Sequence, residues 1–208
     1  MKSSLLVVAA FIVGGILGLS GINPKEFLGD NISVYILHLL LFQVGLNIGS
    51  SDNLKKIIKQ FNLRLLVIPL STIVGTLLFS ALASLLLSNW SVFDCMAVGS
   101  GFAYYSLSSI LITEMKEASI GIQLATELGT IALLANIFRE MMSLVGAPLF
   151  KKYFGKLAPI SAAGVNSMDV VLPTITHFSG KDMIPIAIIH GILLDMSVPF
   201  FVSLFCHL

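Results

Sequence analysis

Apolar segments long enough to cross a lipid bilayer recur along the whole chain, and this feature limits the possible folds more than any other. A transmembrane helix needs about 20 predominantly apolar residues to cross a hydrocarbon core of about 30 Å. Only 11% of the 208 residues are charged, whereas a soluble domain carries about 25%. We therefore predict an all-α integral membrane protein in which residues 1–208 form a single domain. Its apolar segments are 4–20, 32–48, 63–87, 92–113, 119–150, 158–178 and 183–205.

Two of these segments contain clusters of polar and helix-interrupting residues. Segment 92–113 is dense in glycine and serine, and segment 158–178 contains Gly164, Asn166 and Pro173. Irregular backbone at membrane depth is tolerated only where it lines a cavity or is buried in protein. Both segments are therefore predicted to be re-entrant or broken, an arrangement that transporters use to present half-helix ends to a site near the midplane. The alternative is that their small residues merely permit close helix packing.

The distribution of basic residues in the loops indicates how the segments cross. Lysine and arginine concentrate in loops 49–64 and 151–156, and such loops normally lie on the cytoplasmic side. If all seven segments crossed, these two loops would lie on opposite sides of the membrane. If the two interrupted segments each enter and return on one side, both basic loops are cytoplasmic. We therefore favour about five transmembrane helices plus two opposed re-entrant segments over seven plain spans.

Two carboxylates lie deep in these segments, where a charge costs roughly 2.5 to 3.5 kcal/mol on insertion scales. Glu140 lies well inside segment 119–150, and Asp169 lies beside the predicted break in segment 158–178. The neighbouring Arg139 points about 100° away from Glu140 on a helix, so we expect it to snorkel or to bond another segment. At helical spacing, one polar stripe on segment 119–150 comprises Ser143, Glu140, Asn136, Gly129 and Thr126.

Asp169 has two possible roles at this stage, an anionic site for a cation or proton and a structural cap or partner for Arg139. Glu127 and Asp94 are weaker candidates because they lie near segment ends, whereas Asp195 is a possible third site carboxylate. The remaining reactive side chains have ordinary structural explanations. They are His38 and His190, expected as hydrogen-bonded core residues, and Cys95 and Cys206, expected as buried reduced thiols.

No motif for a metal ion or a cofactor is present, and the net charge of +1 gives no reason to expect nucleic acid. Four blocks do resemble a known family in order and spacing. The sequences GFAYYSLSSILITE, REMMSL, SMDVVLP and MIPIAIIHG, which begin at Gly101, Arg139, Ser167 and Met183, resemble the LysO-type lysine exporters of prokaryotes. The resemblance covers essentially the whole chain. It implies a non-enzymatic protein of the cytoplasmic (inner) membrane that exports L-lysine and toxic analogues such as thialysine, driven by the proton motive force.

The resemblance also implies that the two essential carboxylates of the family fall on Glu140 and Asp169. Longer members carry additional N-terminal helices, so the chain resembles the large C-terminal half of a split exporter. We therefore expect a small three-helix membrane partner or a homodimer.

The expected mechanism is alternating access, in which the lysine amino groups bind Glu140 and Asp169 and protons compete for the same carboxylates. The substrate carboxylate is expected at half-helix N-termini and at Tyr105, Ser106 and Ser108. The full candidate set for substrate and proton binding is Glu140, Asp169, Asn136, Tyr105, Ser106, Ser108, Ser167 and Asn166. One alternative is a monovalent-cation/proton antiporter or a cation channel. Another, an intramembrane aspartyl protease using Asp169 and Asp195, lacks the expected GxGD motif.

Overall fold

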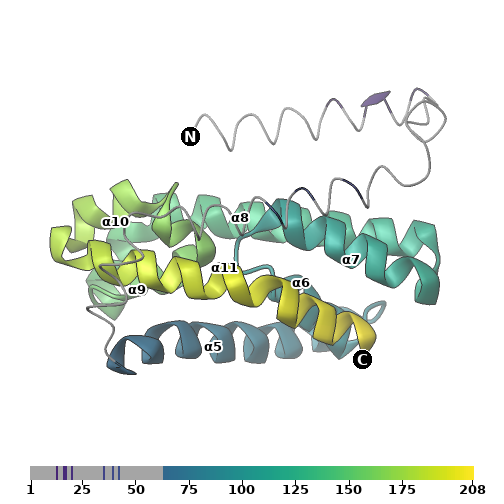
Figure 1. Ribbon diagram of the computed structural model, residues 1–208, viewed down its shortest axis with the longest axis horizontal. Coiled ribbons are helices and arrows are strands. Elements are labelled where there is room, and N and C mark those ends of the chain that lie inside the picture. The colour runs from purple at the N-terminus through teal and green to yellow at the C-terminus, as the bar shows by residue number, and fades with distance from the viewer. Residues whose placement is uncertain are drawn as a thin grey trace.

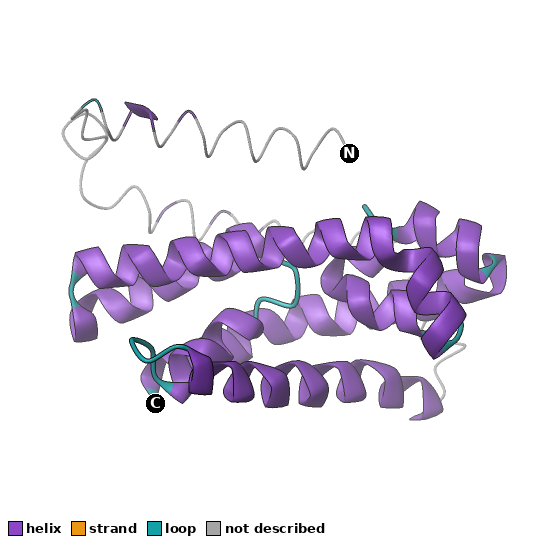
Figure 2. Cartoon of the chain, turned by 180° about the vertical axis from the view of Figure 1, so that it is seen from behind, coloured by secondary structure: helices purple, strands orange, loops and turns teal. Residues whose placement is uncertain are grey.

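The computed structural model describes residues 63–208 continuously. Before that range it describes only Val13, Ile16, Leu17, Ser20, Tyr35, Leu39 and Phe42. The first two predicted segments, His38 and the basic loop 49–62 therefore lie essentially outside the described residues. The described part is helical and contains no strand, which confirms the all-α expectation for that part of the chain (Figure 1; Figure 2). Its helices in chain order are α5 (Val67–Ala83), α6 (Val92–Gly99), α7 (Tyr105–Ile120), α8 (Ile122–Phe154), α9 (Ala158–Ala163), α10 (Leu172–Ser179) and α11 (Ile184–His207).

Three described helical stretches are long and apolar enough to cross a bilayer. They are Val67–Leu86, Ile122–Phe154 and Lys181–His207, and they contain α5, α8 and α11. They lie roughly side by side along the long axis of the molecule (Figure 1). The protein is thus an integral membrane protein whose crossing helices match the predicted segments 63–87, 119–150 and 183–205 to within a few residues.

The predicted segment 92–113 is a helical hairpin that enters and returns at one end. A capping box starts α6, because the Ser91 hydroxyl accepts from the Asp94 amide while the Asp94 carboxylate accepts from the Ser91 amide. The chain reverses between α6 and α7, where Phe102 and Ala103 adopt φ angles of 44° and 76°. Such angles are strained for non-glycine residues. We call residues 100–104 the first tip. The α5–α6 loop and the C-terminal end of α7 lie at the same end of the bundle, so the hairpin enters and leaves the bundle at that end (Figure 2).

The predicted segment 158–178 forms a second hairpin from the opposite end. Pro159 and Pro173 stand in the first turns of α9 and α10, where a proline ring is compatible with a helix. Between these helices the chain forms a 3₁₀ turn, Gly164–Met168, which together with Asp169 we call the second tip. In both views, α9 and α10 lie at the end of the bundle remote from the C-terminus (Figure 1; Figure 2). This arrangement is the opposed re-entrant pair that the charge pattern predicted.

The boundary between segments four and five differs from the expectation. The helix α7 continues to Ile120, and only Gly121 separates it from α8, so Glu114, Lys116 and Glu117 lie on a helix rather than between the two predicted segments. Lys116 is buried and its ammonium pairs with the Asp94 carboxylate at 2.8 Å. Asp94 does lie near a segment end, in the first turn of α6, but it is buried rather than open to water. The pair is stabilised because each buried charge offsets the other.

Candidate functional site

The two re-entrant tips meet in the interior of the bundle. The Val165 amide of the second tip donates a hydrogen bond of 2.9 Å to the Phe102 carbonyl of the first tip. Gly164 makes this approach possible, since its φ is 62° and a Cβ there would lie 2.1 Å from the Phe102 oxygen. The sequence suggested that Gly164 loosens the chain. The structure gives it a more specific role, which is to let two backbones touch.

Asn136 of α8 holds the first tip from the side. Its side-chain oxygen accepts from the Ala103 amide at 2.7 Å, and its amide group donates to the Val98 carbonyl at 3.3 Å and to the Ser108 hydroxyl at 3.4 Å. Val98 precedes the first tip and Ser108 follows it, so one side chain connects both arms of the hairpin. Asn136 is 3% exposed and Ser108 is fully buried. These hydrogen bonds satisfy polar groups that would otherwise be unpaired away from water.

Glu140 lies one helical turn after Asn136 and contacts the second tip. Its carboxylate accepts a hydrogen bond of 2.9 Å from the side-chain amide of Asn166, which also donates to the Ala103 carbonyl at 3.3 Å. Glu140 is 1% exposed. The described part of one chain therefore buries this carboxylate, although we expected a second subunit to be needed. A buried carboxylate between two tips can bind a cationic group.

Asp169 ends the second tip, and its side chain is exposed, unlike that of Glu140. Its carboxylate accepts from the amide of the next residue, Val170, and the Arg139 guanidinium is not among its partners in the described part. Tyr105, the first residue of α7, lies close enough to Glu140 and Asp169 to interact electrostatically with both. Both predicted carboxylates thus act electrostatically on a tyrosine at the start of a half-helix.

The other predicted site residues divide into two groups. Asn136 donates to Ser108 and Asn166 donates to Glu140, and the Ala103 backbone joins the two pairs, because its amide donates to Asn136 and its carbonyl accepts from Asn166. Ser167 instead faces α11, where its hydroxyl donates to the Ala187 carbonyl at 2.9 Å and contacts His190 Nδ1 at 3.1 Å. Ser106 lies in the first turn of α7 and is half-buried. Thr126 departs from the predicted stripe, because it is exposed and bonds the Ile122 carbonyl, whereas the other four stripe positions are buried.

His190 has the structural role that we preferred, since it is fully buried between Ser167 and Thr72, whose hydroxyl lies 3.0 Å from Nε2. Asp195, left open above, is 3% exposed, and its Oδ1 has no hydrogen-bond partner among the described residues. It lies close enough to Asp169 and Tyr104 to interact electrostatically. Its depth in segment 183–205 was the sequence signal for it. Both cysteines are buried and free.

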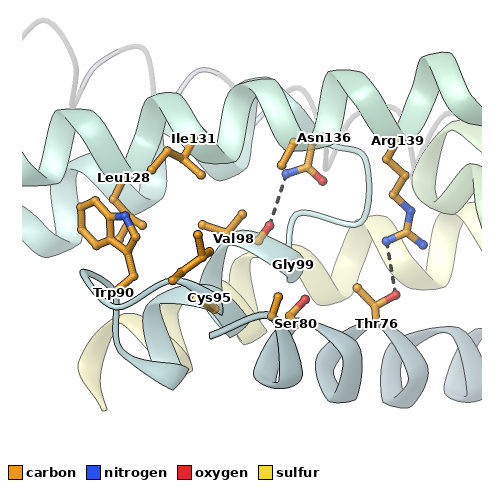
Figure 3. Close-up of a pocket in the computed structure, with 13 residues that line it drawn as sticks. Thr76, Ser80, Trp90, Cys95, Val98, Gly99, Leu128, Ile131, Asn136 and Arg139 are labelled. Carbon is orange, nitrogen blue, oxygen red and sulfur yellow. Dashed lines mark hydrogen bonds between the residues drawn. The ribbon is translucent and has the colours of Figure 1, made fainter. Parts of the chain in front are cut away.

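Arg139 bonds another segment, as one of our two alternatives predicted. Its guanidinium reaches from α8 to α9, where it donates to the Ser161 and Ala162 carbonyls, each at 3.1 Å. It also donates to the Thr76 hydroxyl of α5 at 3.2 Å (Figure 3). A cavity of about 310 Å³ lies beside it between α5, α6 and α8. Among the described residues, no group of His, Cys, Asp and Glu is arranged to hold a metal ion.

Two opposed re-entrant hairpins meet at buried polar groups, an arrangement that membrane transporters use at their binding sites. The sequence profile of the family described as lysine exporter LysO matches residues 8–206. The chain belongs to the LysO lysine exporter family, and this confirms the resemblance on which the sequence analysis relied. The family consists of exporters rather than enzymes, so the protease alternative is not supported.

Two relatives place the chain within this family. Lysine exporter LysO of Escherichia coli (strain K12) is 30% identical over 204 residues, which cover 97% of this chain and 64% of that protein. The chain therefore spans less than two thirds of that relative. A putative lysine exporter of Haemophilus influenzae (strain ATCC 51907 / DSM 11121 / KW20 / Rd) is 27% identical over 202 residues, 96% of each chain. No solved structure matches the chain.

Proposed function

We propose that this protein exports L-lysine, and toxic analogues such as thialysine, across the cytoplasmic membrane by proton-coupled alternating access. The observation that carries the proposal is the position of Glu140, a buried carboxylate at the place where two opposed tips meet. Lysine presents two ammonium groups, and a carboxylate in a low-dielectric site attracts an ammonium strongly. The names of both relatives point to the same substrate.

The arrangement supports alternating access because the two hairpins that carry the tips enter the bundle from opposite ends. Separation of the tips on one side would open the site to that side, while their contact on the other side keeps it closed. The hydrogen bonds between Val165 and Phe102 and between Asn166 and Ala103 are the contacts that such a motion would break. They are few, which is consistent with a site that opens during each cycle.

Proton coupling follows in this proposal from competition for Glu140 and Asp169. A proton and a substrate ammonium cannot occupy one carboxylate together, so entry of protons from outside would release lysine there. The lysine-rich end at residues 151–156 is assigned to the cytoplasm by the positive-inside rule. Export would then run from the end that carries α9 and α10 toward the end that carries the C-terminus.

The test is efflux of radiolabelled lysine from cells or proteoliposomes that contain the purified full chain. Wild-type protein should release lysine faster when an inward proton gradient is imposed. Glu140→Gln keeps the shape of the side chain and removes its charge, so efflux should fall at least about 100-fold on the usual cost of a lost buried ionic partner. Glu127→Gln is the matched control on the same helix, because Glu127 is exposed.

The antiporter alternative needs the same carboxylates but no room for an amino acid. Sodium and potassium flux, measured in the same proteoliposomes, would separate the two functions. Cation flux without lysine flux would overturn the proposal. Lysine flux that is independent of the proton gradient would leave lysine export standing and overturn the coupling.

We also propose that the chain works with a second subunit, either a small three-helix protein or another copy. Asp169 is exposed in the described part of the chain. The outer face of α5 exposes a continuous set of large apolar side chains, namely Val67, Leu70, Val74, Leu78, Phe79 and Leu82. Lipid or protein can cover such a face, but an exposed carboxylate at the tip needs a polar or protein environment.

A further inference from the structure

Arg139 is a cation inside the bundle whose hydrogen-bond partners among the described residues are all uncharged. It is half-buried, and it donates to the carbonyls of Ser161 and Ala162 and to the hydroxyl of Thr76. These bonds use three of the five N–H groups of a guanidinium. A cation at membrane depth is costly, and neutral oxygens orient it without neutralising its charge. A residue held in this way is prepared to receive an anion.

Two cavities adjoin at Arg139. The first, of about 310 Å³, extends from Arg139 along α5 and α6 to Trp90 (Figure 3). The second, of about 560 Å³, extends from Arg139 toward Ser71 at the start of α5 and Ser161 of α9. Both are lined by Thr76 and by Arg139 itself. The two cavities also share Ser80 and Ala83, so they adjoin along α5, and the guanidinium forms part of the wall of both.

The first cavity also connects this cation to the carboxylate network. Asn136 lines the cavity, and its amide donates to the Val98 carbonyl, as the dashed line in Figure 3 marks. Glu140 follows Asn136 by one helical turn and is adjacent to Arg139 in the chain. A positive and a negative side chain thus project from neighbouring positions of α8, about 100° apart. An amino acid that carries both an ammonium and a carboxylate matches this pair of charges.

We propose that Arg139 binds the carboxylate of the amino-acid substrate, in the cavity between α5, α6 and α8. The proposal rests on the function proposed above and assigns the carboxylate to Arg139, whereas the sequence led us to expect it at half-helix N-termini and at Tyr105, Ser106 and Ser108. A guanidinium binds a carboxylate through two parallel hydrogen bonds, which gives geometric selectivity as well as charge. The Arg139 site would distinguish an amino acid from a diamine or an inorganic cation.

The first experiment measures competition against radiolabelled lysine binding to the full chain in nanodiscs. The competitors are lysine, lysine amide and cadaverine, the last two of which keep the ammonium groups and lack the carboxylate. Wild-type protein should bind lysine about 10- to 100-fold more tightly than lysine amide, the usual range for a charged hydrogen-bonded pair. In Arg139→Gln this ratio should fall to about 1, and Arg139→Lys should be intermediate because it keeps the charge and loses the fork.

The ratio separates recognition from folding, because a purely structural defect weakens both ligands together. An unchanged ratio in Arg139→Gln would overturn the assignment while leaving lysine export intact. A wild-type protein that binds neither lysine nor lysine amide would instead overturn the proposed function. The two failures are therefore distinguishable in one assay.

The second experiment keeps Arg139 and places a competing carboxylate of the protein itself next to its guanidinium. Thr76→Glu puts a carboxylate beside the guanidinium, which lies 3.2 Å from the native hydroxyl. Thr76→Gln has the same size without the charge and measures the steric effect alone. Lysine affinity should be about 10-fold lower in the glutamate variant than in the glutamine variant, with cadaverine equal or tighter. Equal lysine affinity in both variants would contradict the proposal, even if Arg139→Gln does not fold.

Discussion

The side-chain amide of Asn166 donates a hydrogen bond of 2.9 Å to the carboxylate of Glu140, and the same amide group contacts the Ala103 carbonyl of the other re-entrant tip. One residue of the second tip thus joins the buried carboxylate of α8 to the first tip. Any movement that separates the tips must change the surroundings of Glu140. This relationship couples the access pathway to the charge that we propose binds the substrate.

Loss of the Asn166 amide should disturb Glu140 specifically. We expect Asn166→Leu to leave a buried carboxylate without this donor, at a cost of about 1 to 3 kcal/mol in the free energy of unfolding. In Glu140→Gln the same substitution should cost less, because the acceptor is no longer charged. A double-mutant cycle from thermal unfolding in detergent measures this coupling. Additive effects would show that the hydrogen bond contributes nothing.

Gly164 should not tolerate even a methyl group. Gly164→Ala imposes a φ of 62° on alanine and places Cβ 2.1 Å from the Phe102 carbonyl oxygen. We expect the stability to fall by about 2 kcal/mol or more, and lysine efflux to be lost with the contact between the tips. Gly155→Ala is the control, because its φ of 89° is also unfavourable but no atom lies within 4 Å. Equal losses in both variants would show that the backbone angle alone matters.

Replacing Lys116 alone should lower the stability of the protein more than replacing both Lys116 and Asp94. Lys116→Met leaves the Asp94 carboxylate buried without its partner at 2.8 Å, at an expected cost of about 3 to 5 kcal/mol. Adding Asp94→Asn should recover most of this loss, since no uncompensated charge remains and the cap on α6 is partly retained. Thermal unfolding of the three variants tests the prediction. A double variant less stable than Lys116→Met would contradict it.

Cysteine labelling from each side of the membrane tests the re-entrant scheme. Tyr153 is 67% exposed at the end of α8, and Ser119 is exposed near the end of α7. We expect a label at residue 153 to react from the cytoplasm and one at residue 119 to react from outside. Ser119 is a better labelling site than the nearby Lys116, because Lys116 is buried. Positions 25 and 53, expected outside and inside respectively, lie beyond the described residues. Reaction of residues 53 and 153 from opposite sides would contradict the scheme.

The subunit composition is tested by mass photometry in lipid nanodiscs together with lysine efflux. We expect the active particle to contain two copies of the chain or one copy with a small membrane partner. The physical reason is that a second subunit would cover the exposed face of α5 and the exposed carboxylate of Asp169. A particle with a single chain that exports lysine in proteoliposomes would overturn this expectation.

The sequence by itself determined the three spans that the structure describes, the two broken segments and the buried position of Glu140. These features are local, because hydropathy sets which residues enter the bilayer and clusters of glycine, proline and polar residues set where a helix can stop. Periodicity also placed Asn136 and Glu140 on one buried face. Periodicity failed for Thr126, which is exposed although it has the same helical spacing. Spacing describes a single helix and not the neighbours that cover it.

Only the tertiary structure decided which distant residues meet. The contact between Val165 and Phe102, the bond from Asn166 to Glu140 and the pair of Lys116 with Asp94 join residues of different elements. No local pattern specifies such partners, because they depend on how the hairpins pack against α8 and α11. The surroundings of Arg139 are the clearest case. The sequence left its partner open, and packing placed it among neutral oxygens beside a cavity, where an unneutralised cation can attract an anion.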